Sequence, residues 1–278
     1  MIIWIASYPK SGNTWVRSLL SAYLYSNDGF FNFKLLKHME QFPGKKHFEF
    51  FLKDFKDAKK VSEFWIAAQE RINLSNENIF FKTHHSLCKI DNNIFTNKSN
   101  TKAAIYVVRD PRNVITSISH HYDMNMEEAF NFMTDKSMTL VNRKKYSSVV
   151  KIIGNWSDNY NSWKNLNFAP LLIVKYEDLI KDTTQTLKSI LNFLSKFMEV
   201  KIDENKIINV INSCSFETLA KTEKEEGFAE AVKTIKDQKQ LNFFYLGKKN
   251  DWKELLNPKI EKKIRESFLK EMKEIGYI

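Results

Sequence analysis

The sequence predicts an α/β fold with a largely parallel sheet. Short apolar runs of strand type recur along the chain, and the segments between them carry the spacing of amphipathic helices. Strands of a parallel sheet are buried on both faces and so appear as continuous apolar runs, and each crossover between them needs a helix. We find no internal repeat, and 7 Gly and 5 Pro are scattered rather than gathered into a linker. We therefore expect one domain over residues 1–278.

Each expected element follows from its own residues. The expected strands are Ile2–Ala6, Ile79–Phe81, Ala103–Val108 and Leu171–Val174. The expected helices are Thr14–Tyr25, Val61–Leu74, Arg112–Asn125, Val149–Trp163, Thr183–Phe197 and Pro258–Ile275. Pro111 and Pro258 stand where a first helical turn tolerates proline. Trp156 and Trp163 share one helix face and are expected in the core. The charged, weakly periodic segment Lys221–Asp251 is expected to form a flexible lid over a ligand.

Composition limits the possible classes of function. A chain of 278 residues with 43% hydrophobic residues can bury a core, so disorder is not expected. No apolar run reaches the roughly 18 residues of a membrane span, and the first residues lack a basic leader, so we expect a cytoplasmic protein. Cys88 and Cys214 form no C-x-x-C pair, which predicts neither a disulfide framework nor a cysteine zinc site. The net charge of +10 favours an anionic ligand, whether nucleotide, polynucleotide or membrane surface.

The first expected strand runs into a loop typical of anion binding and then into a helix. A helix N-terminus offers unpaired backbone N–H groups and a partial positive charge. Lys10, the hydroxyls of Ser11 and Thr14, and Gly12, which allows close backbone approach, complete a cradle for an anion. The loop is not a Walker A motif, because Lys10 precedes Gly12 instead of following it. The alternative is an ordinary turn with a surface lysine.

A second polar turn follows the expected strand Ala103–Val108. Ligands of open α/β sheets bind beyond the carboxyl ends of the strands, where Arg109 is placed. Ser117 lies about one and a half turns into the helix that follows, so both side chains can converge on one anion. The planar guanidinium fork suits a terminal phosphate. The alternative is that Arg109 pairs with Asp110 or another carboxylate.

The third signal is the strand that ends in Lys82, His84 and His85, at the same edge of the sheet. Histidine is the side chain best suited to proton transfer near neutral pH, and a neighbouring ammonium group lowers its pKa and keeps it neutral as a base. Adjacent histidines on a strand face opposite ways, so they do not predict a metal site. An ordinary structural role for both is the alternative.

Together these segments resemble the sulfotransferase superfamily that uses 3′-phosphoadenosine-5′-phosphosulfate (PAPS). The resemblance covers about residues 2–253 and lies in the order and spacing of the motifs. The matching segments are Tyr8–Trp15 (YPKSGNTW), Lys82–His84 (KTH), Arg109 with Ser117, Leu172–Leu179 (LIVKYEDL), Ser215–Phe216 and Gly247–Lys253 (GKKNDWK). The first is highly specific to the family, and the others are moderately so.

The resemblance implies a role for each matching residue. It implies that the 5′-phosphosulfate is held by Lys10, Gly12, Asn13 and Thr14. It also implies that adenine stacks on Trp15 with help from Phe216 and that Tyr176 contacts the nucleotide. Arg109 and Ser117 would bind the 3′-phosphate. His84 would take the proton of an acceptor hydroxyl, or less often amine, while Lys82 and Lys10 stabilise charge on the sulfuryl group and on the leaving phosphate. The donor would be PAPS, the product 3′,5′-adenosine bisphosphate (PAP), and the acceptor a small or medium-sized molecule; no metal is required.

The sequence departs from the family pattern near its C-terminus. Tyr245–Leu246 replace the Arg-Lys pair that closes on the 3′-phosphate just before the family's glycine, here Gly247. Lys248 and Lys249 are expected to reach back from the following positions. Asn250 replaces a second glycine, and asparagine tolerates a positive φ better than most residues, so this turn is expected to persist. The K-T-V-x-x-x-E dimer motif has no convincing match, which leaves the oligomeric state open.

Three other classes of function compete with this interpretation. A P-loop kinase would need a Walker A lysine and an acidic magnesium ligand, for which Asp110 is the sole candidate beside a phosphate loop. A nucleic-acid-binding module would need aromatic and basic residues interleaved on a strand platform, which the sequence lacks, so no nucleic acid partner is expected. The missing Arg-Lys pair suggests a nucleotide-binding relative without catalysis, whereas the presence of both Lys82 and His84 argues against it.

Overall fold

A five-stranded parallel sheet forms the centre of the molecule. The computed structural model describes residues 1–141, 148–234 and 238–278. The strands lie in the order β2 (Met39–Gln41), β3 (Ile79–Thr83), β1 (Ile2–Ser7), β6 (Thr101–Val108) and β9 (Leu171–Lys175), and every neighbouring pair is parallel. The expected α/β class and all four expected strands are confirmed. The edge strand β2 was not expected, because three residues are too few to show a periodic pattern.

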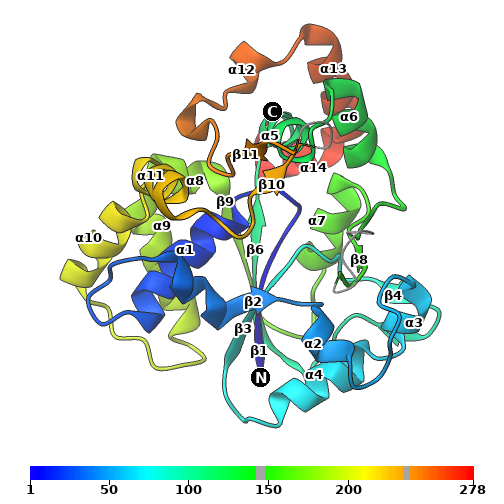
Figure 1. The fold of residues 1–278 in the computed structure, drawn as a ribbon, viewed down its shortest axis with the longest axis vertical. Coiled ribbons are helices and arrows are strands. Elements are labelled where there is room, and N and C mark those ends of the chain that lie inside the picture. Colours follow the sequence, from blue (N-terminus) through cyan, green and yellow to red (C-terminus); the bar gives the residue numbers. More distant parts are fainter. Residues whose placement is uncertain (142–147, 235–237) are drawn as a thin grey trace.

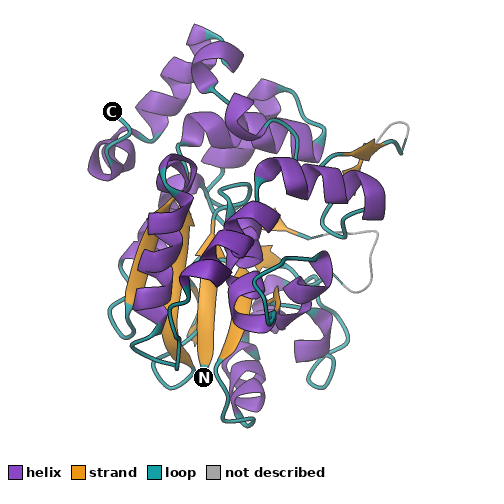
Figure 2. Ribbon diagram, turned by 90° about the vertical axis from the view of Figure 1, so that its left-hand side faces the viewer, coloured by secondary structure: helices purple, strands orange, loops and turns teal. Residues whose placement is uncertain are grey.

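Helices cover both faces of the sheet (Figures 1 and 2), and each face has its own apolar core. Ile3 and Ile5 of β1 pack into one core, together with α1 (Asn13–Tyr25), α9 (Thr183–Leu194) and α10 (Glu204–Ser213). Ile2 and Trp4 pack into the opposite core, together with α4 (Trp65–Asn73), α5 (Pro111–Tyr122) and α7 (Trp156–Lys164). Successive strand residues face opposite ways. An apolar residue at every position of β1 therefore serves both cores.

The remaining elements are mostly short and surround this framework. They are η1 (Phe33–His38), α2 (Lys45–Phe48), α3 (Ala58–Ser62), β4 (Lys89–Ile90), β5 (Asn93–Ile94), α6 (Met126–Thr134), β7 (Thr139–Leu140), β8 (Lys151–Ile152), α8 (Tyr176–Lys181), α11 (Phe216–Glu226), β10 (Val232–Lys233), β11 (Gln240–Leu241), η2 (Gly247–Lys249), α12 (Trp252–Leu255), α13 (Pro258–Ser267) and α14 (Leu269–Ile275). The expected helix Val61–Leu74 is divided between α3 and α4. The expected helix Pro258–Ile275 is divided between α13 and α14.

The expected helix Val149–Trp163 is wrong in its first half. Lys151–Ile152 form β8, which pairs with β7, and the helix begins only at Trp156. Gly154 has a φ of 61° and Asn155 caps the helix by accepting a hydrogen bond from the Asp158 N–H, so local chemistry stops the helix from extending further back. Trp156 and Trp163 are buried in the core, as their spacing predicts.

The expected lid, Lys221–Asp251, is more regular than its weak periodicity predicts. Its first residues belong to α11, which the Ser215 side chain caps at the N-terminus and which ends at Gly227. Beyond it, β10 and β11 pair as an antiparallel hairpin. Glu223 of α11 accepts hydrogen bonds from the backbone N–H groups of Phe243 and Phe244, which joins α11 to the residues that follow β11. Residues 235–237 lie outside the described part of the chain.

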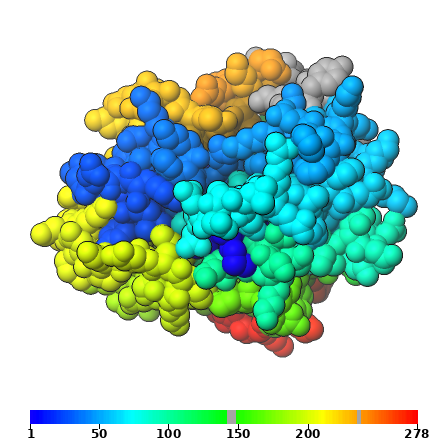
Figure 3. All heavy atoms as spheres, turned by 90° about the horizontal axis from the view of Figure 1, so that it is seen from below, coloured from blue at the N-terminus to red at the C-terminus, as the bar shows by residue number. Residues whose placement is uncertain are grey.

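The parallel arrangement brings the carboxyl ends of all five strands to one edge of the sheet. The N-terminal end of β1 reaches the surface at the opposite end, between segments coloured cyan, green and yellow (Figure 3). Polar loops that follow β1, β3 and β6 thus begin at neighbouring points. Within the described ranges, none of the helices has the length and apolarity needed to cross a membrane.

Candidate active site

A cavity of roughly 430 Å³ is lined by the residues that follow the central strands. This size suits a small-molecule or nucleotide ligand. Most residues that the sequence analysis placed in the site line it, whereas Ser11, His85 and Lys249 do not. The lining residues are Lys10, Gly12, Asn13, Thr14, Trp15, Lys82, His84, Arg109, Ser117, Tyr176, Phe216, Gly247 and Lys248. The three motifs therefore meet in one place, although they are spread over about 100 residues of the chain.

The loop between β1 and α1 passes directly beside a tyrosine ring. Gly12 adopts a φ of 103°, and a Cβ atom there would lie 2.4 Å from Cδ2 of Tyr176, so only glycine fits. No side chain caps the N-terminus of α1, which leaves its first N–H groups available to an anion. Ser11 lies outside the cavity lining, with its buried hydroxyl lacking a hydrogen-bond partner.

Side chains at the start of α1 differ in what they contact. The Asn13 amide donates to the Ile5 carbonyl at 2.9 Å and to Ser7 Oγ at 3.2 Å, so this side chain braces the loop against β1. Thr14 Oγ1 donates instead to Glu230 at 3.0 Å. Trp15 donates through Nε1 to the Cys214 carbonyl at 2.9 Å, and its ring meets Tyr176 edge-on.

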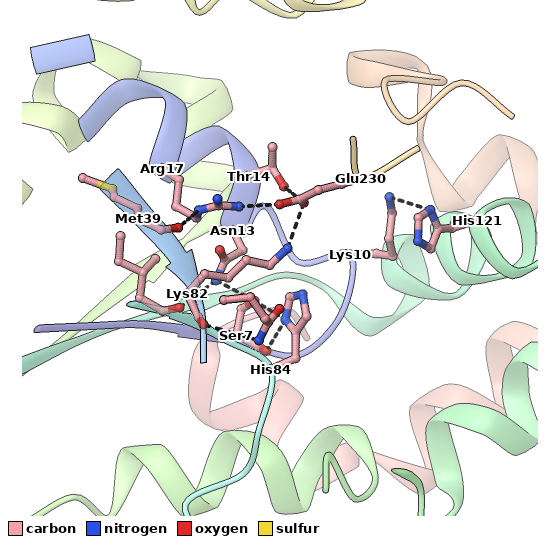
Figure 4. Close-up of polar contacts among 12 residues, drawn as sticks. Ser7, Lys10, Asn13, Thr14, Arg17, Met39, Lys82, His84, His121 and Glu230 are labelled. Atoms are coloured by element: carbon pink, nitrogen blue, oxygen red, sulfur yellow. Dashed lines mark hydrogen bonds and ion pairs between the residues drawn. The ribbon is translucent and has the colours of Figure 1, made fainter. Parts of the chain in front are cut away.

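The Lys10 ammonium group is surrounded by rings rather than by carboxylates. Its Nζ lies 3.6 Å from the centre of the Phe243 ring. The same atom lies 3.4 Å from Nδ1 of His121 (Figure 4). Burial lowers the pKa of Lys10 to about 7, and the charges of Lys82 and Arg109 act in the same direction while Glu230 opposes them. Because a bound anion would favour the charged form, such a lysine gains from binding one.

Arg109 is a buried cation that holds the loop and faces the cavity. Its Nη1 donates to the Lys10 carbonyl and to Ser117 Oγ, both at 3.2 Å, and its guanidinium lies 4.2 Å from the centre of the Tyr176 ring. The Nε atom is buried without a hydrogen-bond partner. The convergence of Arg109 and Ser117 is the arrangement that their spacing predicts.

The alternative that pairs Arg109 with Asp110 is wrong. Asp110 instead forms an ion pair of 2.7 Å with Arg112 and caps α5. No carboxylate of the described segments lies within ion-pair distance of Arg109. A buried guanidinium without a counter-ion is a strong site for an anionic ligand.

Lys82 and His84 project from the end of β3. The Lys82 ammonium pairs with Glu230 at 2.8 Å. Nδ1 of His84 lies 2.9 Å from the Ser7 carbonyl, and since a carbonyl only accepts, Nδ1 carries the proton and Nε2 of the neutral ring carries a lone pair. Burial and the charge of Lys82 hold the pKa of His84 well below its usual range. The neutral tautomer present is therefore the one that a base needs.

His85 turns to the other side of the strand and belongs to the core. It is fully buried, stacks on Phe95 with ring centres 4.3 Å apart, and donates through Nδ1 to the Ser86 carbonyl at 2.7 Å. Burial lowers the pKa of His85 to about 3. Of the two adjacent histidines, the cavity thus receives only His84.

The low pKa of His85 predicts a loss of stability in mild acid. The unfolded chain takes up a proton at His85 below about pH 6.5 and the folded chain does not, so the free energy of unfolding is expected to fall by about 2 kcal/mol per such residue between pH 7.5 and 5. Urea unfolding of the wild type and of His85→Asn, which keeps a donor for Ser86, measures this. The free energy of unfolding of the variant should fall by about 2 kcal/mol less over the same pH range. An equal fall in both proteins would contradict the lowered pKa of His85.

Sequence reasoning missed Arg17, His121 and Glu230. Arg17 donates to the Met39 carbonyl and to Glu230, and its place one helical turn after Thr14 was a signal that could have found it. His121, in the last turn of α5, lines the cavity beside Lys10. Glu230 lies 216 residues beyond Thr14 and no motif marks it.

The C-terminal segment docks differently from the expectation. Gly247 has a φ of 55° and packs on Phe216 so closely that an added Cβ would lie 2.7 Å from the ring. Asn250 has a φ of −77°, so the expected positive φ is wrong there. Its side chain instead donates to Ser117 Oγ at 2.9 Å and accepts from Thr116. Of the two lysines expected to reach back, Lys248 lines the cavity and Lys249 does not.

Comparison with known proteins identifies the family. The model of the sulfotransferase domain matches residues 2–276. The chain is 29% identical to luciferin sulfotransferase of Photinus pyralis over 225 residues, which are 77% of this chain and 55% of that protein. It is 26% identical to flavonol 3-sulfotransferase of Flaveria bidentis over 94% of this chain and 78% of that protein. The first of these matches thus spans little more than half of its relative.

Solved structures share the fold. Mouse sulfotransferase SULT7A1 complexed with PAP superimposes with a TM-score of 0.54 and 19% identity, covering 97% of this chain and 83% of that one. Retinol dehydratase in a complex with retinol and PAP gives a TM-score of 0.60 and 18% identity, covering 98% and 81%. With the family match over nearly the whole length, the chain belongs to the sulfotransferase domain family.

Proposed function

We propose that residues 1–278 form one sulfotransferase domain that moves the sulfuryl group of PAPS to a hydroxyl, or less readily an amine, of a small or medium-sized acceptor. The observation that carries the proposal is the convergence of Lys10, Lys82 and Arg109 with the uncapped start of α1 around one cavity. Several cationic groups around one cavity suit a ligand that carries more than one anionic group. The relatives named above are sulfotransferases, and the two structural neighbours were solved with PAP.

The residues present fit such a nucleotide. Arg109 and Ser117 would take the 3′-phosphate, and the unpartnered Nε of Arg109 would gain an acceptor. The 5′-phosphosulfate would lie against Lys10, Gly12, Thr14 and the N–H groups of α1. Trp15, Tyr176 and Phe216 would bracket the adenine, and Gly247 and Lys248 would close the site from the C-terminal segment.

The chemistry needs a base on one side of the sulfur and cations on the other. Nε2 of His84 accepts the acceptor's proton as the new oxygen–sulfur bond forms. The bond from sulfur to the bridging phosphate oxygen breaks, and Lys82 and Lys10 stabilise the negative charge on the departing 5′-phosphate. Since the proton ends on His84 and the electron pair on the phosphate, the step balances without another reactant.

Incubation with ³⁵S-labelled PAPS and a panel of phenols, alcohols and amines tests the proposal. We expect a labelled product with at least one acceptor, and one PAP formed for each sulfate transferred. PAP binding without transfer to any acceptor would favour the nucleotide-binding relative without catalysis. Transfer of phosphate from ATP would instead favour the kinase, although Asp110, its expected magnesium ligand, is engaged by Arg112.

A further inference from the structure

The carboxylate of Glu230 lies inside the proposed phosphosulfate site. It accepts from Thr14 Oγ1 at 3.0 Å and from Lys82 Nζ at 2.8 Å through one oxygen, and from Arg17 Nη1 at 2.7 Å through the other (Figure 4). Thr14 and Arg17 belong to α1 and Lys82 to β3, whereas Glu230 comes from the segment between α11 and β10. A distant part of the chain thus inserts an anion among three donors.

The three donors form a set suited to an oxyanion. Each offers a proton, and two carry a positive charge on a side chain that is only 4% (Arg17) or 10% (Lys82) exposed. Leaving two such cations together without a counter-charge would be costly at this depth. Although burial opposes it, Lys82 and Arg17 hold the pKa of Glu230 well below its usual range. The inserted group is therefore an anion throughout the working range of pH.

The same donors cannot serve Glu230 and a nucleotide at once. Lys82 and Thr14 belong to the proposed site of the 5′-phosphosulfate, and a second anion within about 4 Å of the carboxylate would meet strong repulsion in a cavity of low polarity. Either the carboxylate leaves or the anionic group does not enter. Gly227, which ends α11 with a φ of 76° and has no atom within 4 Å of its Cβ position, gives the Glu230 segment a point about which to move.

We infer that the Glu230 carboxylate occupies the place of two anionic oxygens of the nucleotide's 5′ group. When the nucleotide binds, its 5′ group displaces Glu230 from Thr14, Lys82 and Arg17. Arg17 is thereby a further ligand of the 5′ group. The inference rests on the proposed function. One anion replaces another, so no covalent bond forms or breaks and no proton is transferred. Glu230 consequently sets the affinity for the 5′ end of the nucleotide and leaves the 3′ end unaffected.

Replacing Glu230 with glutamine is expected to tighten PAP binding by about tenfold or more. When a site is open for only a fraction of the time, its apparent affinity is reduced to that fraction of the intrinsic affinity. A tenfold gain in PAP affinity would therefore mean that the Glu230 carboxylate is inserted about nine-tenths of the time in the wild type. Binding of adenosine 3′-monophosphate, which lacks the 5′ group, should be unchanged. Isothermal calorimetry with both nucleotides measures the difference.

Two further variants complete the test. Glu226→Gln removes the same charge from an exposed position near Glu230 and should leave PAP affinity unchanged. Arg17→Lys in the Glu230→Gln background should weaken binding of PAP several-fold but not that of adenosine 3′-monophosphate. Thermal unfolding of each variant verifies that it is folded, and Glu230→Ala replaces Glu230→Gln if the latter is not.

The outcomes separate this inference from the proposed function. The inference alone would be overturned if the wild-type protein binds PAP and Glu230→Gln binds it equally or more weakly. Glu230 would then either have no effect on PAP binding or contribute to it. A gain equal for both nucleotides, or for Glu226→Gln as well, would also overturn it. Failure of both the wild type and the variant to bind PAP would overturn the proposed function together with the inference.

Discussion

Replacement of His84 with alanine is expected to lower kcat by at least about 10²-fold while the affinity for PAP stays close to that of the wild type. General bases of this kind contribute about 10²–10⁴-fold to the rate. His84 is neutral, with its proton fixed on Nδ1 by the Ser7 carbonyl, so loss of the ring removes the lone pair that receives the acceptor's proton. Initial rates at saturating PAPS and acceptor, together with calorimetry for PAP, measure the two quantities.

Two observations would show that the base and not the local structure was lost. Added imidazole should restore part of the activity of His84→Ala, since it can enter the vacated space. His121→Ala should keep most of the activity, because Nδ1 of His121 faces the Lys10 ammonium and is engaged by it. Normal turnover of His84→Ala would instead place the base on another group of the cavity.

Replacement of Arg109 with lysine is expected to weaken PAP binding by about 10²-fold and AMP binding much less, since AMP can lose only the support that Arg109 gives to the Lys10 loop. Hydrogen bonds to charged groups contribute about 1.5–3 kcal/mol each, and lysine cannot reproduce the guanidinium fork. AMP has no 3′-phosphate, so the ratio of the two dissociation constants isolates this contact. Calorimetry with both nucleotides provides that ratio.

Arg112 offers a matched control for Arg109. It is also a buried arginine near the start of α5, but its polar partners are Asp110, Glu261 and the Tyr277 carbonyl, and it does not line the cavity. Arg112→Lys should lower the melting temperature and keep the preference for PAP over AMP. An equal loss of PAP and AMP affinity in Arg109→Lys would mean that Arg109 only supports the loop.

The sequence predicts the arrangement of this site because its motifs sit at strand ends. Carboxyl ends of parallel strands must meet at one edge, so the approach of Lys10, Lys82 and Arg109 follows from topology alone. The approach of Ser117 to Arg109, eight residues earlier in the chain, likewise follows from the geometry of the helix between them. A motif cannot state what each of its side chains contacts. Asn13 lines the cavity but bonds to β1, and Ser11 lies outside the cavity, although both belong to the same motif.

Longer-range features escaped prediction for a physical reason. Glu230 and Asn250 act through contacts with residues more than 100 positions away, and neither a period nor a local spacing encodes such a contact. Gly154 and Asn155 stopped a helix that the apolar spacing alone extended, because the conformation at a cap outweighs weak periodicity. Local rules therefore give the framework, and tertiary contacts decide how the C-terminal segment completes the cavity.

Arg109 donates from one nitrogen both to Ser117 and to the carbonyl of Lys10. The side chain proposed to recognise one end of the nucleotide thus also fastens the loop that receives the other end. Occupancy of either end would then preorganise its counterpart, so the two phosphates would contribute cooperatively rather than additively to affinity. The whole nucleotide would therefore bind more tightly than the combined affinities of its fragments suggest.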